Sequence, residues 1–177
     1  MWENLEVEVD ICERCKLGKK YGNIRIVGQG NQEAEIFFLL DEINRKEAEK
    51  RLLLEDENGK LLKKFFEYSN LNIDRCYFTT LTKCYKTDNI IEEKDIEMCR
   101  NFLDTQIALV NPKYIISVGE KPTKALIKDQ KVDMKKMFGE EYSYFGTPVI
   151  PIYDIDYFLN KTTDKEKWKI ANIFAKI

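Results

Sequence analysis

Short apolar runs alternate along the chain with longer segments in which apolar residues recur every three to four positions. The short runs indicate strands, and the longer pattern is typical of helices that bury one face. The expected strands cover residues 23–27, 35–40, 76–81, 114–118 and 148–152. The expected helices run from Asp56 or Asn58 to about residue 68, and over 92–110, 121–128 and 165–176. Strands that alternate with helices predict a parallel sheet with helices on both faces.

The predicted fold is therefore an α/β protein with three layers, α/β/α, around a mainly parallel sheet of four to five strands. A chain of 177 residues without repeats or Gly/Pro-rich linkers is suited to one domain, residues 1–177. In such sheets, ligands bind beyond the carboxyl ends of the strands. This rule directs attention to the segments after Leu40, Leu81, Gly119 and Ile152.

Composition narrows the class of protein. Hydrophobic residues make up 44% and charged residues 34%, as in ordinary globular proteins. The longest apolar runs are near five residues, whereas a bilayer span needs about 20. The first residues carry neither the basic start nor the apolar stretch of a secretory signal. We therefore expect a cytoplasmic monomer without a membrane segment.

Charge and histidine content exclude several kinds of chemistry. The chain has 29 basic and 31 acidic side chains, a net charge of −2, so only a local patch of the surface can attract nucleic acid. It contains no histidine. This excludes Ser-His-Asp and Cys-His nucleophiles, histidine-ligated zinc, and any imidazole acid or base.

Five cysteines offer a possible metal site. Cys12 and Cys15 form a C-x2-C pair, and Cys84 and Cys99 follow much later. Four thiolates are the right number for zinc or for an iron–sulfur cluster, although free cysteines also serve simply as core residues. Cys76 lies in an apolar, strand-like run and is interpreted as a core residue.

The order of several motifs resembles the family 4 uracil-DNA glycosylases, which carry a [4Fe-4S] cluster. The matching segments are Cys12-Glu13-Arg14-Cys15-Lys16-Leu17, Thr82-Lys83-Cys84, Met98-Cys99-Arg100-Asn101-Phe102-Leu103 and the stretch from Gln106 to Gly119. The resemblance implies the uracil-DNA glycosylase fold. It also implies that Cys12, Cys15, Cys84 and Cys99 hold the cluster, which organises a DNA-facing loop in that family. Zinc bound to the same four thiolates is the alternative.

The segment that corresponds to the family's first active-site motif, G-E-A-P-G, differs from that motif in this chain. The corresponding residues are Leu40-Asp41-Glu42-Ile43-Asn44, without either glycine or the proline. Asp41 or Glu42 takes the acidic position of the motif, depending on whether the two sequences are aligned with a one-residue gap. A carboxylate there can stabilise a cation-like sugar or orient a water molecule.

Three positions that contact the base in the family are also changed. Leu54 stands in place of a stacking phenylalanine, Thr80 in place of a base-reading asparagine, and Asp154 in place of a histidine that donates to uracil. Leucine lacks an aromatic face, and a hydroxyl cannot supply the paired donor and acceptor of an amide. An aspartate carboxylate repels the anion that forms as uracil leaves. Together these changes predict weak or absent uracil excision.

Partner and function follow from the same resemblance. Lys121 and Lys124, in the helix after Gly119, are candidate DNA contacts, although each alone also suits a solvated helix face. The interpretation is a DNA-binding protein of the base-excision type with most catalytic motif residues replaced. The alternatives are an active glycosylase for a different damaged base and a non-catalytic iron–sulfur protein that binds a partner.

Overall fold

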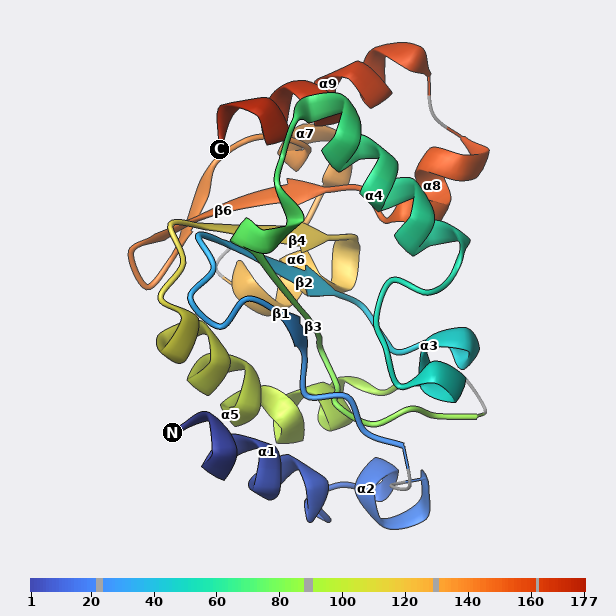
Figure 1. The fold of residues 1–177 in the computed structure, drawn as a ribbon, viewed down its shortest axis with the longest axis vertical. Coiled ribbons are helices and arrows are strands. Elements are labelled where there is room, and N and C mark those ends of the chain that lie inside the picture. Colours follow the sequence, from blue (N-terminus) through green and yellow to red (C-terminus); the bar gives the residue numbers. More distant parts are fainter. Residues whose placement is uncertain (22–23, 88–90, 129–130, 162) are drawn as a thin grey trace.

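The computed structural model describes residues 1–21, 24–87, 91–128, 131–161 and 163–177 (Figure 1). Six strands of this part form one sheet in the order β1-β3-β2-β4-β6-β5. The strands are β1 (Gln29–Gly30), β2 (Ile36–Leu40), β3 (Cys76–Thr80), β4 (Tyr114–Val118), β5 (Tyr142–Tyr144) and β6 (Thr147–Ile152). The central four, β3, β2, β4 and β6, are parallel, and β1 and β5 pair antiparallel at the two edges.

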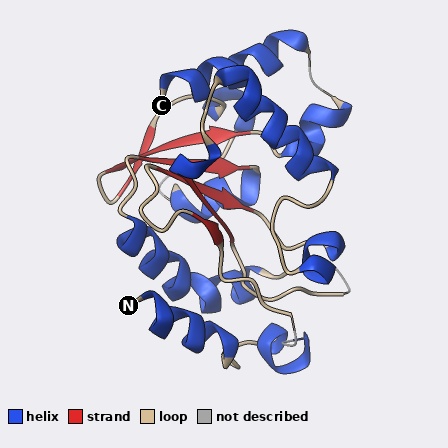
Figure 2. Cartoon of the chain, viewed as in Figure 1, coloured by secondary structure: helices blue, strands red, loops and turns tan. Residues whose placement is uncertain are grey.

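Helices cover both faces of this sheet (Figure 2). The helices are α1 (Trp2–Asp10), α2 (Lys16–Tyr21), α3 (Arg45–Lys50), α4 (Glu57–Ser69), α5 (Glu93–Val110), α6 (Glu120–Leu126), α7 (Met134–Met137), α8 (Ile155–Asn160) and α9 (Asp164–Lys176), with a short 3-10 helix at Ile73–Arg75. In Figure 1, α4, α8 and α9 lie above the sheet, and α5 and α1 lie below it. This arrangement confirms the predicted three-layer α/β/α fold.

Alternating side chains of the central strands build two separate cores. Phe38 of β2 packs with Phe66 of α4 and Phe174 of α9 on one face. Phe37, the preceding residue of β2, lies on the other face with Leu103 of α5. Because successive strand residues point to opposite faces, a strand buried on both sides is apolar throughout, as this one is.

Outside these layers, α1 packs on the outer side of α5. Leu5 and Val9 of α1 are buried against Phe102 of α5, in a small third core. This contact brings the N-terminal segment, and the first two cysteines with it, to the middle of the chain.

The sheet differs from the prediction at its edges. It has six strands rather than four to five, because β1 and β5 are two and three residues long, too short to give an alternating pattern. No strand covers 24–27, and residue 23 lies outside the described part of the chain. Arg25 makes a single antiparallel bridge to Cys84 instead. The helix expected over 121–128 ends at Leu126.

Within the described residues, no helix is both long and apolar enough to cross a bilayer.

Candidate functional site

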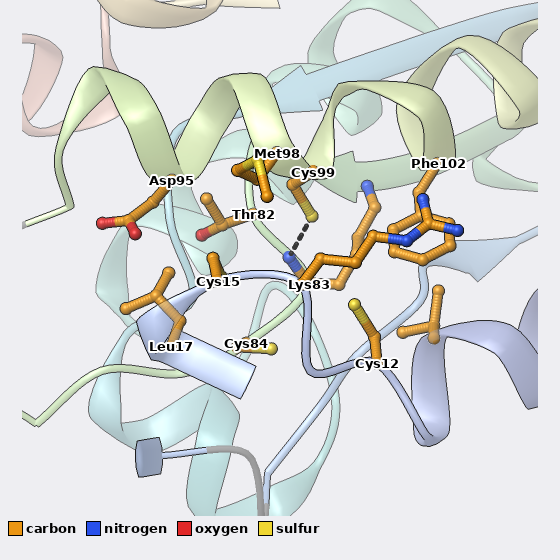
Figure 3. A pocket seen from close by; sticks show the side chains of 12 residues that line it. Cys12, Cys15, Leu17, Thr82, Lys83, Cys84, Asp95, Met98, Cys99 and Phe102 are labelled. Atoms are coloured by element: carbon orange, nitrogen blue, oxygen red, sulfur yellow. Dashed lines mark hydrogen bonds between the residues drawn. The ribbon is translucent and has the colours of Figure 1, made fainter. Parts of the chain in front are cut away.

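Four cysteines from distant parts of the chain line one small cavity (Figure 3). Cys12 follows α1, Cys15 immediately precedes α2, Cys84 follows β3, and Cys99 lies in α5. We name this space the thiol cavity. Apolar side chains complete much of its wall: Val9, Leu17, Met98 and Phe102. Cys76 lies apart from it, fully buried in the core beside β2, as the sequence predicts.

Two basic residues hold the segments around the thiol cavity in place. The backbone N–H of Lys83 donates to Cys99 Sγ at 3.4 Å. The guanidinium of Arg25 donates to the backbone oxygens of Cys12, at 2.9 Å, and Gly18, at 3.4 Å. Because Arg25 also bridges to Cys84, it connects both cysteine-bearing loops.

Burial raises the pKa of two of these thiols, Cys84 and Cys99. Burial raises the pKa of Cys84 to about 12, and the nearby Cys99 adds to the rise. The pKa of Cys99 is raised by burial as well. Thiols bind metals as thiolates, so a metal that binds here must displace protons.

The residues of the thiol cavity fit a thiolate-bound group. The donors are soft sulfur atoms from three segments, with an N–H directed at one of them, a feature that tunes iron–sulfur centres. Thr82 lines the same cavity, and its buried Oγ1 has no hydrogen-bond partner in the described part of the chain. In that part, no three His, Cys, Asp or Glu side chains converge on a single-ion site. The four thiols surround the cavity instead.

Lys83 connects the thiol cavity to the end of β3. The residue is almost completely buried, and its ammonium donates to Thr79 Oγ1 at 2.5 Å and to the backbone oxygen of Thr80 at 2.7 Å. Burial lowers the pKa of Lys83 to about 8. Thr79 Oγ1 in turn donates to the backbone oxygen of Val27, which also accepts from Gln106 Nε2. Such a buried polar network fixes the backbone it touches.

A larger cleft, about 790 Å³ in volume, lies at the carboxyl ends of the strands. Its lining includes Asp41, which follows β2, and Asp154, which follows β6. Lys121 and Lys124 of α6 line it too. The structure therefore brings four of the predicted site residues together, at the edge of the sheet where ligands bind in this class of fold. We name it the carboxyl-end cleft.

Charges within the carboxyl-end cleft are largely balanced. Asp41 pairs with Lys121 at 3.1 Å, and Lys124 pairs with Glu93. Its described lining has five acidic and four basic side chains. Asp154 is exposed, and its Oδ1 accepts the backbone N–H of Tyr157 at 2.9 Å, so this carboxylate caps α8. The two predicted DNA-contact lysines are thus already paired with carboxylates.

Glu42 lies beside the carboxyl-end cleft but is not among its described lining residues. Burial raises its pKa, and the neighbouring charge of Asp41 raises it further. Between the two acidic residues that the sequence left open, Asp41 is the one that faces the cleft.

Leu54 and Thr80 are also absent from the described lining of the carboxyl-end cleft. The Thr80 side chain is buried, and its Oγ1 donates to the backbone oxygen of Thr82 at 2.7 Å. Leu54 is buried just before α4, in the left-handed conformation with φ of 62°. The structure engages both side chains within the protein, outside the described lining of the carboxyl-end cleft.

Sequence reasoning missed three features near these positions. One is Lys83, which belongs to a matching motif but was assigned no role of its own. Another is Glu47, a buried carboxylate that accepts N–H groups from Asn44 and Leu54. The Asn-x-x-Glu spacing of a capping box signals it. The last is a pocket around Leu54 that is lined by four lysines: Lys46, Lys50, Lys60 and Lys63. The sequence shows their spacing, which is i, i+4 for the first pair and i, i+3 for the second.

Known proteins that are similar to this chain belong to one family. The family model described as Uracil DNA glycosylase superfamily matches residues 27–177. A type-4 uracil-DNA glycosylase of Sulfurisphaera tokodaii is 32% identical over 124 residues, which cover 69% of this chain and 56% of that relative. The protein of the same name from Saccharolobus solfataricus is 31% identical over 150 residues, covering 80% and 69%. One from Thermotoga maritima is 24% identical over 167 residues, covering 93% and 86%.

The chain thus spans a little over half the length of the Sulfurisphaera relative. The family match nevertheless covers most of the chain, including every strand and all the residues of the carboxyl-end cleft. The chain belongs to the uracil DNA glycosylase superfamily.

Proposed function

We propose that this protein binds DNA as a base-excision-repair protein, carries a [4Fe-4S] cluster in the thiol cavity, and excises uracil weakly or not at all. The proposal draws on relatives named type-4 uracil-DNA glycosylases and on the four thiols around one cavity. The observation that carries its functional part is the exposed carboxylate of Asp154 in the carboxyl-end cleft.

The expected reaction is hydrolysis of an N-glycosidic bond. Water attacks C1′ of the sugar, the bond from C1′ to the base nitrogen breaks, and the base leaves as an anion that takes up a proton. Asp41 faces the cleft and suits the role of stabilising positive charge on the sugar or orienting the water. Lys121, at 3.1 Å, holds the Asp41 carboxylate.

Asp154 acts against this reaction when the base is uracil. The family resemblance places it where a donor meets the uracil oxygen, and its carboxylate instead brings negative charge to the leaving anion. A missing oxyanion donor costs about 3 kcal/mol of transition-state stabilisation. Leu54 and Thr80 are engaged in the protein interior, which leaves few groups to hold the base.

A carboxylate acceptor in the cleft also suits a base that presents N–H groups. This favours, as the alternative, an active glycosylase for a different damaged base. The position of Asp154 in the lining of the carboxyl-end cleft supports it.

The [4Fe-4S] cluster, when bound, supplies iron–thiolate bonds that join the N-terminal segment to α5 and to the loop after β3. Arg25 and the N–H of Lys83 already position these segments around the cavity. Lys83 then extends the connection to Thr80 at the end of β3. These contacts support a structural role for the cluster.

The activity test uses anaerobically purified protein and duplex and single-stranded oligonucleotides that carry uracil, hypoxanthine, xanthine or an alkylated base. DNA binding is measured by fluorescence anisotropy, and abasic sites are measured under single-turnover conditions, for wild type, Asp41→Asn and Glu42→Gln. DNA binding with little uracil excision is the expected result. Excision of another base that Asp41→Asn loses and Glu42→Gln retains supports the alternative. Rapid uracil excision, or no DNA binding, refutes the proposal.

The cofactor test measures iron, acid-labile sulfide, zinc and visible absorbance in wild type, Cys99→Ala and Cys76→Ala. Cys76 is a matched control because it is buried in the core away from the thiol cavity. We expect iron and sulfide in wild type and in Cys76→Ala, and their loss in Cys99→Ala. Stoichiometric zinc without iron in wild type and in Cys76→Ala would show that the cluster is wrong.

A further inference from the structure

A second pocket, about 430 Å³ in volume, lies between α3 and the start of α4. It is separate from both the thiol cavity and the carboxyl-end cleft, because it shares none of their described lining residues. We name it the lysine pocket. Its described lining residues are Lys46, Lys50, Leu54, Glu55, Lys60 and Lys63.

The lysine pocket carries excess positive charge. Glu55 pairs with Lys50 at 2.8 Å and with Lys63 at 3.9 Å. Glu57, on the adjoining turn of α4, pairs with Lys46 at 3.7 Å and with Lys60 at 2.8 Å. Four ammonium groups therefore share two carboxylates through these pairs, and the charge of Asp56 also acts on Lys60. Among the described lining residues, lysines outnumber acidic side chains by four to one.

These ion pairs do not prevent an external anion from binding. The lysine side chains are between 39% and 60% exposed, and exposed pairs contribute about 0–1 kcal/mol. Each lysine is a flexible point charge that can turn from a carboxylate to a phosphate oxygen. The carboxyl-end cleft differs, because its acidic side chains outnumber its basic ones by one.

The lysine pocket lies beyond the carboxyl ends of the strands, as the carboxyl-end cleft does. Its first helix, α3, begins four residues after Asp41, at the carboxyl end of β2 (Figure 1). Its second helix, α4, packs against α8, the helix that Asp154 caps, through the rings of Phe65 and Phe158. Both elements are thus attached to the residues that line the cleft.

Several contacts fix the loop that joins α3 to α4, the two helices that carry the lysines. The N–H of Leu54 donates to the buried carboxylate of Glu47 at 2.7 Å, and the N–H of Leu53 donates to Gln29 Oε1 at 2.8 Å. The backbone of Leu54 lies so close to Gly59 that a Cβ there would meet Leu54 Cα at 2.3 Å. A phosphate site on this frame needs little ordering of the chain when its ligand binds.

We propose, resting on the proposed DNA binding, that the lysine pocket holds backbone phosphates of the DNA strand whose base enters the carboxyl-end cleft. Lysines that neutralise phosphates release counterions, so their contribution falls as salt rises. Glu55 then competes with the phosphates for Lys50 and Lys63. Its removal strengthens DNA binding, whereas removal of lysines weakens it.

The test measures fluorescence anisotropy of labelled duplex and single-stranded oligonucleotides over a range of salt concentrations. In Lys46→Gln/Lys60→Gln we expect binding about tenfold weaker, and a slope of log affinity against log salt that is smaller by about 1 to 2. In Glu55→Gln we expect binding about twofold to fivefold tighter.

Matched controls lie at the opposite end of the sheet. Glu35 likewise pairs with two cations, Arg75 and Lys113, at the amino ends of β3 and β4. Lys176, beside the C-terminus, is exposed at the same end, where Arg75 binds the Ile177 oxygen. Lys113→Gln/Lys176→Gln and Glu35→Gln therefore make the same charge changes away from the lysine pocket.

The outcomes separate this inference from the proposed function. Wild-type protein that binds no DNA refutes the proposed function and this inference with it. DNA binding by wild type, combined with equal effects in the pocket variants and their matched controls, refutes the lysine pocket alone. Effects confined to the pocket variants, with opposite signs for lysine and glutamate removal, support it.

Discussion

Replacement of Asp154 by asparagine tests whether the charge of this side chain is what weakens uracil excision. Asparagine caps helices as well as aspartate does, so the bond from the Tyr157 N–H to the side-chain oxygen is retained. The substitution removes one of the five negative charges that line the described part of the carboxyl-end cleft. It also supplies an amide N–H₂ that can donate to the uracil oxygen. We therefore expect Asp154→Asn to excise uracil faster than wild type.

The size of the gain follows from the exposure of Asp154. Two like charges at about 4 Å repel by about 4 kcal/mol at an effective dielectric of 20, and by about 1 kcal/mol in water. Asp154 is exposed at an open cleft, which favours the lower part of that range. A relief of about 1–2 kcal/mol corresponds to a rate about 5- to 30-fold higher.

Single-turnover formation of abasic sites in a uracil-containing oligonucleotide measures this rate. Asp156→Asn is the matched control, because Asp156 is an exposed carboxylate of the same helix and is not among the described lining residues of the cleft. Thermal unfolding checks that the α8 cap survives. The inhibitory role of the Asp154 charge is refuted if Asp154→Asn excises uracil no faster than wild type, or if Asp156→Asn gains as much.

Three further predictions concern the scaffold. The ring of Phe38 is fully buried between the central strands and α4. Phe38→Ala is therefore expected to lower the free energy of unfolding by about 3–5 kcal/mol in urea titrations. A loss below about 1 kcal/mol contradicts the packing described. Asp56→Ala removes the side chain that accepts the Gly59 N–H at 2.8 Å, and is expected to cost about 1 kcal/mol in the same assay. Hydrogen bonds from Lys113 and Arg75 lower the pKa of Glu35 to about 2 from 4.5. A carboxyl with a lowered pKa stabilises the fold above its unfolded pKa, and this stability is lost as pH falls through about 2. Glu35→Gln should therefore lower the thermal midpoint clearly at pH 7 and by much less near pH 2. Equal losses at both values contradict this role of Glu35.

The central elements were predictable because their signals are local. The apolar run at residues 35–40 became β2, Ile36–Leu40, and the periodic segment at 92–110 became α5, Glu93–Val110. A doubly buried strand and a long amphipathic helix each carry their pattern within one stretch of chain. The edge strand β5 carries no such pattern, because three residues are too few to show an alternation.

The arrangement of the candidate site depended on contacts between distant segments. Sequence motifs indicated a common role for Cys12 and Cys99, and the structure shows them around one cavity because α1 packs on α5. The motifs offered no reason to choose between Asp41 and Glu42, and only Asp41 lines the described part of the cleft. Successive residues of an extended segment point their side chains in opposite directions. A motif match that is uncertain by one residue therefore cannot tell which carboxylate faces the cleft.

The fold class could be predicted from the chain alone, because apolar periodicity is a property of the sequence. The set of four thiols was indicated by motifs that resemble those of a known family. Which charges meet became visible only once the elements were packed together. Lys121 lies against Asp41, and the four lysines of the lysine pocket share two glutamates around Leu54. The pairing of Asp41 with Lys121 depends on the distance between segments far apart in the sequence, and that of Lys46 with Glu57 depends on how α3 and α4 meet across a short loop. Because electrostatic interaction depends on distance and on burial, the chemistry of the site followed from the packing of those elements.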